Sequence, residues 1–171
     1  MSGFGVRRLG AAFARRCSAA YLSALDRSPL LDSEKRRQVT ALQNDSELNT
    51  LPYSEAFKDH LAHPRNAGEL ADANAVAEQT NPVCGDRLRL NLRIRDGRIE
   101  AVRFLAYGCP PTLASGSALV EMLDGMTIED ALKLTRKEIV TALGGLPSRK
   151  QHAAALAIET LRMAIENRST R

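Results

Sequence analysis

In the second half of the chain, hydrophobic residues first alternate with polar ones and then recur every three to four positions. The alternation is strongest in residues 87–95, RLRLNLRIR, where leucine or isoleucine fills every second position. A period of two predicts a strand with one face in the core and the other in water. Asp96-Gly97 then predicts a two-residue hairpin turn. Residues 98–107 are therefore expected to return as the antiparallel partner, and residues 75–80 form a weaker third strand.

Helical periods flank these strands. Tyr53, Phe57 and Leu61 form the stripe of an amphipathic helix. After the hairpin, residues 113–123 predict a helix rich in small residues, two short capped helices follow, and Pro147 opens a final helix. Strands followed by helices indicate an α+β domain. We expect a small antiparallel three-stranded sheet that helices cover on one face, with a C-terminal helix.

The start of the chain has a different composition. The first 25 residues contain four arginines and no acid, which fits a mitochondrial transit peptide and also an upstream extension of the reading frame. We expect residues 1–52 to be a poorly ordered basic leader and linker, with a helical stretch near residues 33–42. Residues 53–167 then form one domain and residues 168–171 a tail. Apolar runs are well short of the ~20 residues that span a membrane.

The basic charge belongs to the leader. Residues 1–50 hold eight Lys or Arg and five Asp or Glu, and subtracting these from the totals of 24 and 20 leaves 16 and 15 for the remainder. The arginine-rich strand face lacks the interleaved aromatics of a base-stacking platform, so we expect neither nucleic acid nor a membrane as partner. Cys17, Cys84 and Cys109 are an odd number of cysteines, which favours a reducing compartment and thiols free to bind metal.

Candidate chemistry lies in the stretch N-P-V-C-G-D, residues 81–86, and at Cys109. Cys84 and Asp86 precede the long strand and Cys109 follows its partner, so antiparallel pairing brings the three to one end of the sheet. Cys109 also precedes a helix, whose free N–H groups and dipole favour a thiolate, the form that binds metal. Taken alone, two cysteines 25 residues apart are equally typical of buried apolar positions.

The sequence from N-P-V-C-G-D to Y-G-C resembles the U-type iron-sulfur cluster scaffold family, in which a Cys-Gly-Asp loop, a hairpin and a Tyr-Gly-Cys turn recur in this order. The resemblance covers roughly residues 53–166. It implies a non-enzymatic scaffold or carrier that binds iron and a labile 2Fe-2S cluster, receives sulfur from a cysteine desulfurase and passes the cluster to acceptor apo-proteins. It also implies that Cys84 and Cys109 hold iron, while Asp86, a harder ligand, keeps the cluster exchangeable. A mere capping or hydrogen-bonding role for Asp86 is the alternative.

One departure from the family pattern affects the metal ligands. The family carries a His-Cys pair at the start of its last helix, whereas this chain has His152 followed by Ala153. In the family that cysteine is a cluster ligand and the acceptor of sulfur. His152 can complete a four-ligand site with the two thiolates and the carboxylate, since imidazole replaces thiolate in some two-iron centres and in zinc sites. Alternatively, the fold is kept, the cluster is lost, and a single zinc or iron ion, or none, is bound.

A second departure affects partners. The family's Leu-Pro-Pro-Val-Lys segment, which an Hsp70-type chaperone recognises in many members, reads L-P-S-R-K here. Leu146, Pro147 and Lys150 remain as candidate partner-binding residues, but dependence on the chaperone is doubtful. A cysteine enzyme with Cys109 as nucleophile and His152 as base is a weaker alternative, because an oxyanion-hole signature is missing. We expect a bacterial cytoplasmic protein, with the mitochondrial matrix as the alternative location.

Overall fold

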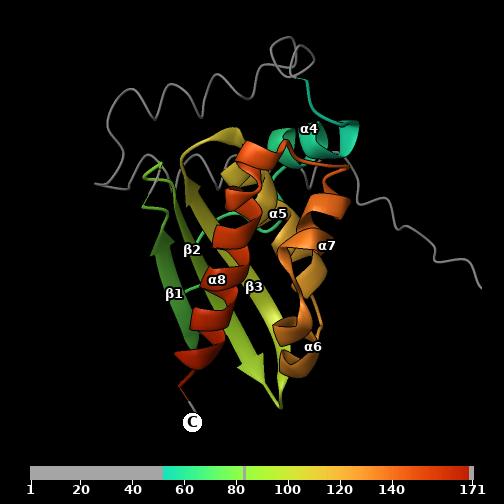
Figure 1. Ribbon diagram of the computed structural model, residues 1–171. Coiled ribbons are helices and arrows are strands. Elements are labelled where there is room, and N and C mark those ends of the chain that lie inside the picture. The colour runs from blue at the N-terminus through green and yellow to red at the C-terminus, as the bar shows by residue number, and fades with distance from the viewer. Residues whose placement is uncertain (1–51, 83, 170–171) are drawn as a thin grey trace, which may run out of the picture.

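A computed structural model of the protein describes residues 52–82 and 84–169, which form an α+β fold (Figure 1). The expected leader, its helical stretch and Cys17 lie outside the described residues. Within them, no helix is long and apolar enough to cross a membrane. The elements in chain order are α4 (Glu55–Ala62), β1 (Ala75–Thr80), β2 (Arg87–Arg95), β3 (Arg98–Tyr107), α5 (Pro110–Leu123), α6 (Ile128–Lys133), α7 (Arg136–Ala142), the 3₁₀ turn η1 (Ser148–Lys150) and α8 (His152–Glu166).

The three strands form one antiparallel sheet in the order β1-β2-β3. Asp96 and Gly97 have φ values of 50° and 71°, which confirms the two-residue turn between β2 and β3. The alternating leucines of β2 are fully buried. A register shift between Arg93 and Ile94 interrupts the alternation, and Ile94 is therefore only half-buried. The predicted sheet is confirmed, with this irregularity added.

Helices cover one face of the sheet (Figure 1). α5 packs on β3, α8 packs on β1 and β2, and the two helices contact each other. Close approach of α5 depends on Gly116, because a Cβ there would lie 2.6 Å from the buried Phe104 ring. The predicted helix rich in small residues is confirmed, and its small residues permit this close packing.

α5 begins at Pro110, directly after Cys109; proline is tolerated there because a residue in the first helical turn needs no intrahelical N–H donor. Pro147, by contrast, does not open the last helix: Ser148–Lys150 form a 3₁₀ turn, and α8 begins at His152. β2 starts, β3 ends, and α5 and α8 begin at the same end of the fold, at the top of Figure 1. All the candidate ligands lie on or beside these four termini.

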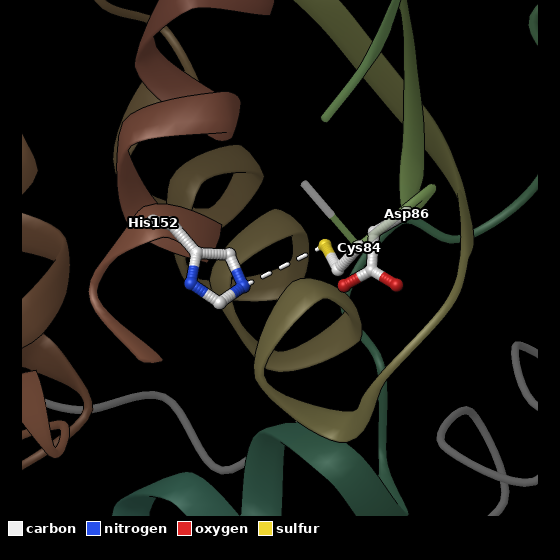
Figure 2. Close-up of side chains that lie close together, drawn as sticks. All are labelled: Cys84, Asp86 and His152. Atoms are coloured by element: carbon white, nitrogen blue, oxygen red, sulfur yellow. Dashed lines mark hydrogen bonds between the residues drawn. The ribbon is translucent and has the colours of Figure 1, made fainter. Parts of the chain in front are cut away.

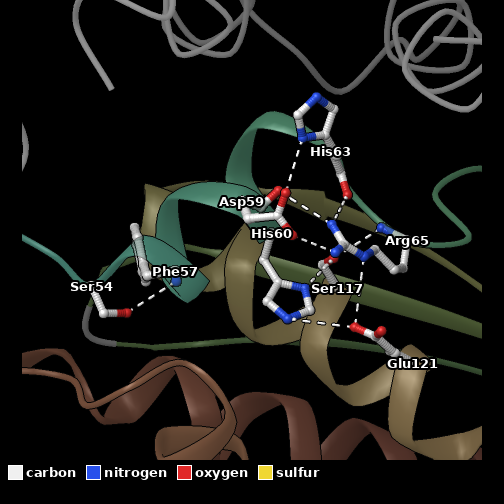
Figure 3. Close-up of polar contacts among 8 residues, drawn as sticks. All are labelled: Ser54, Phe57, Asp59, His60, His63, Arg65, Ser117 and Glu121. Carbon is white, nitrogen blue, oxygen red and sulfur yellow. Dashed lines mark hydrogen bonds and ion pairs between the residues drawn. The ribbon is translucent and has the colours of Figure 1, made fainter. Parts of the chain in front are cut away.

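A buried polar contact holds α4 on α5 (Figure 3). The Nδ1 atom of His60 lies 2.9 Å from the Ser117 hydroxyl, which also accepts a hydrogen bond from the Arg65 backbone N–H. The Nε2 atom of His60 lies 3.5 Å from Glu121. Burial lowers the pKa of His60 below 6.5, as does the charge of Arg65, whereas the charges of Glu121 and Asp59 raise it.

Gly116→Ala is expected to destabilise the protein by about 1–3 kcal/mol, the usual cost of overpacking a core, although alanine favours a helix by ~1 kcal/mol over glycine. The buried Phe104 ring must move to admit the new methyl group. Urea unfolding measures the loss, and the same substitution in a Phe104→Leu background should cost less. Stabilisation by Gly116→Ala would contradict the close contact.

The stability of the fold should fall as the pH drops below about 6.5. Above this value His60 is neutral in both states; below it the unfolded chain takes up the proton first, because the folded pKa is lowered. Chemical unfolding between about pH 7 and pH 5 should therefore show a smaller loss of stability for His60→Gln than for the wild type. Equal losses in the two proteins would show that the buried imidazole does not contribute.

Candidate metal centre

The loop before β2 presents Cys84 and Asp86 differently. The Asn81 backbone N–H donates to the Asp86 carbonyl at 2.7 Å, and the Gly85 N–H donates to the Asn81 carbonyl at 2.8 Å. Gly85 has a φ of 70°, a value that glycine adopts without strain. This tight turn leaves Cys84 exposed, whereas only 6% of Asp86 is exposed.

The Asp86 carboxylate accepts three hydrogen bonds from the start of α5. Its Oδ2 atom accepts from the Thr112 hydroxyl at 2.7 Å and from the Cys109 thiol at 2.9 Å. Its Oδ1 atom accepts from the Cys109 backbone N–H at 3.2 Å. Cys109 is the N-cap residue of α5, so the carboxylate satisfies donors at the helix start. The hydrogen-bonding role considered for Asp86 is therefore present in the structure.

Gly108 makes room for this carboxylate. A Cβ at Gly108 would lie 2.2 Å from Oδ1 of Asp86, and the φ of Gly108 is 151°. A side chain is thus excluded by contact as well as by backbone conformation. Gly108 and Thr112 were not among the predicted site residues. The signals that could have identified them are the glycine directly before Cys109 and a hydroxyl residue in the first turn of the following helix.

Cys84 and His152 complete one group of candidate ligands with Asp86 (Figure 2). The Cys84 Sγ atom lies 3.7 Å from Nε2 of His152. One ligand atom from each of Cys84, Asp86 and His152 lies within 4.8 Å of the others. Cys109 is connected to the group through its thiol contact with Asp86. The structure thus places three predicted ligands together, and the fourth, Cys109, contacts one of them, Asp86.

The charges in the site favour a cation. Burial raises the pKa of Asp86, but the hydrogen bonds from Cys109, Thr112 and Cys84 together lower it by more, so the net shift is downward. The carboxylate is therefore ionised. In the described part of the chain, no Lys, Arg or His side chain forms an ion pair with it. Buried charges in proteins are generally paired or coordinate metals.

The thiols do not have the thiolate character that the position of Cys109 before a helix had suggested. Burial raises the pKa of Cys109, and so does the hydrogen bond to the adjacent Asp86 carboxylate. Desolvation raises the pKa of Cys84 as well, with the charge of Asp86 adding to the effect. That expectation is corrected because burial and the neighbouring carboxylate both disfavour the Cys109 thiolate. A bound metal ion would itself displace the thiol protons.

The donor set fits zinc or iron. Two sulfurs, one imidazole nitrogen and one carboxylate oxygen are ligands that both metals accept. Ala153, which follows His152, is buried with 1% of its surface exposed. It contributes no ligand, so two of the four candidate donors are soft.

The candidate partner segment lies next to the start of α8. Leu146 is buried in the core, whereas Pro147 is exposed and Lys150, the last residue of η1, is half-buried. Of these three candidate partner-binding residues, Pro147 and Lys150 are therefore accessible to a partner.

Comparison with known proteins identifies relatives over this region. The NifU-like N terminal domain family matches residues 52–171. The protein named iron-sulfur cluster assembly scaffold protein IscU 1 of Archaeoglobus fulgidus is 45% identical over 113 residues, which cover 66% of this chain and 74% of the relative. The IscU scaffold protein of Aquifex aeolicus is 44% identical over 117 residues, covering 67% of this chain and 74% of the relative.

Solved structures share the fold. A candidate iron-sulfur cluster assembly scaffold protein for the SUF system from Fervidobacterium islandicum superposes with a TM-score of 0.58 at 21% identity, covering 71% of this chain and 99% of that one. An N-terminal NifU-like protein from Brucella abortus gives a TM-score of 0.54 at 19% identity, with coverages of 67% and 92%. The resemblance to U-type scaffolds is confirmed, and the chain belongs to the family of NifU-like N-terminal domains.

Proposed function

We propose that this protein is an iron-sulfur cluster assembly scaffold, which holds iron and a labile 2Fe-2S cluster as cargo at Cys84, Asp86, Cys109 and His152. The observation that carries the proposal is the buried, ionised Asp86 carboxylate. It has no cationic side chain paired with it among the described residues, and two thiols and an imidazole lie around it. A metal ion would neutralise this charge and use all four donors.

The relatives support this assignment, since the Archaeoglobus and Aquifex proteins are named as cluster assembly scaffolds. On this basis the protein is not an enzyme, and it works in the cytoplasm with a cysteine desulfurase as sulfur donor and apo-proteins as acceptors. The exposed Pro147 and the half-buried Lys150, next to the ligand His152, provide a contact surface for such partners.

A single bound zinc or iron ion is the second candidate function. The observation that favours it is Ala153, where the family pattern has a third thiolate. Zinc accepts four mixed sulfur, nitrogen and oxygen ligands in a closed site, whereas two-iron clusters are held mainly by thiolates.

Anaerobic reconstitution with iron and sulfide separates the two functions. A scaffold should show sulfur-to-iron charge-transfer absorption with equal amounts of iron and sulfide. Cys84→Ala, Cys109→Ala and His152→Ala should each abolish the absorption, because each removes one of four ligands. Ala153→Cys should increase the amount of cluster retained, since it adds a soft ligand next to the site.

Cys17→Ala is the control, because this cysteine lies in the leader and its loss should leave the absorption unchanged. Bound zinc without a chromophore would favour the mononuclear site. An unchanged spectrum in Cys84→Ala would contradict the ligand assignment.

Gly108→Ala should weaken iron binding, because the new methyl group collides with the Asp86 carboxylate. The expected loss of folding stability is about 2–4 kcal/mol, from backbone strain and broken buried hydrogen bonds. Gly85→Ala is the matched control: its φ is also positive, but its Cβ would contact nothing within 4 Å. Iron binding and urea unfolding are measured for both. Equal effects of the two substitutions would exclude a specific role for the contact between Gly108 and Asp86.

A further inference from the structure

We propose that Thr112 is a positioning residue of the metal centre, whose hydroxyl fixes the Asp86 carboxylate in the orientation from which it binds the ion. The inference rests on the proposed metal centre and adds a residue outside the ligand set. Thr112 lies in the first turn of α5, three positions after Cys109. Thr112 is buried, with 1% of its surface exposed, so water does not compete for the hydrogen bond from its hydroxyl.

The geometry supports this role. The Thr112 hydroxyl donates to Oδ2 of Asp86 at 2.7 Å, the shortest of the three hydrogen bonds that reach the carboxylate from α5. Gly108 closes the neighbouring side, because its backbone lies against Oδ1. The carboxylate is therefore held from two directions, by a hydroxyl outside the proposed ligand set and by a backbone without a side chain. Such outer contacts orient a ligand before the ion arrives.

Metal binding would make the orientation of the Asp86 carboxylate depend more strongly on Thr112. When Cys109 becomes a ligand, its thiol proton is released to solvent and the thiol no longer donates to Oδ2. The carboxylate then keeps two donors from α5, the Cys109 backbone N–H on Oδ1 and the Thr112 hydroxyl on Oδ2. Of these, only the hydroxyl can be removed by substitution without changing a ligand.

A cobalt(II) titration of the full-length chain tests the inference, with the thiolate-to-cobalt absorption as the readout. Thr112→Val keeps the shape and removes the hydroxyl, and it should raise the cobalt Kd by about 10–100-fold, the usual effect of losing an outer contact to a ligand. Thr112→Ser keeps the hydroxyl and should bind close to the wild-type value. In an Asp86→Ala background, Thr112→Val should have no further effect on the Kd.

The outcomes distinguish this inference from the proposed function. An unchanged Kd in Thr112→Val, with cobalt bound by the wild type, would overturn the positioning role and leave the metal centre intact. An equal loss of affinity with and without Asp86 would also overturn it, because Thr112 would then act through the fold or through the Cys109 sulfur, which lies 3.6 Å from its hydroxyl. Absence of cobalt binding by the wild type would overturn both. Should the valine variant not fold, Thr112→Ala and Thr112→Ser provide the same comparison.

Discussion

The end of the fold that carries the candidate ligands depends on the hydrogen bonds between the buried Asp86 carboxylate and the start of α5. Removing an ionised carboxylate from water is costly unless other groups replace the lost hydrogen bonds. Here the start of α5 supplies them, through one backbone N–H, one hydroxyl and one thiol. Because Asp86 precedes β2 and Cys109 follows β3, the same contact joins the loop, the end of the hairpin and the first turn of α5. The contacts around the candidate metal centre are therefore part of the fold itself.

The packing of α5 and α8 on the sheet positions the remaining candidate ligand, His152. α5 reaches the sheet closely because Gly116 has no side chain to separate it from Phe104, and α8 lies beside α5 over β1 and β2. The 3₁₀ turn before α8 ends just ahead of His152, which brings the imidazole next to Cys84 at the helix start. Packing of the helices on the sheet thus sets the distance between two candidate ligands on separate elements.

The sequence predicted what depends on local patterns. The alternation in β2 and the Asp96-Gly97 turn specify the hairpin, and antiparallel pairing then brings the Cys84 loop to Cys109. The state of the Cys109 thiol was predicted wrongly, because it depends on burial and on a carboxylate that only the tertiary structure places beside it. Thr112 was missed because a threonine in a first helical turn usually satisfies local backbone groups, whereas its hydroxyl here donates to Asp86, which is distant in the sequence. Contacts between distant segments leave no period in the sequence.

The four candidate ligands fall into two halves with different mechanical support. Asp86 and Cys109 are bound to each other and to α5, whereas Cys84 is exposed on a loop, and its contact with His152 spans two separate elements. An ion at this site would leave by breaking its contacts to Cys84 and His152, while Asp86 and Cys109 kept their geometry. A third thiolate next to His152 would strengthen the half formed by Cys84 and His152, since soft ligands hold iron and zinc most firmly. In the proposed metal centre, Ala153 at this position would therefore favour release of the ion over its retention.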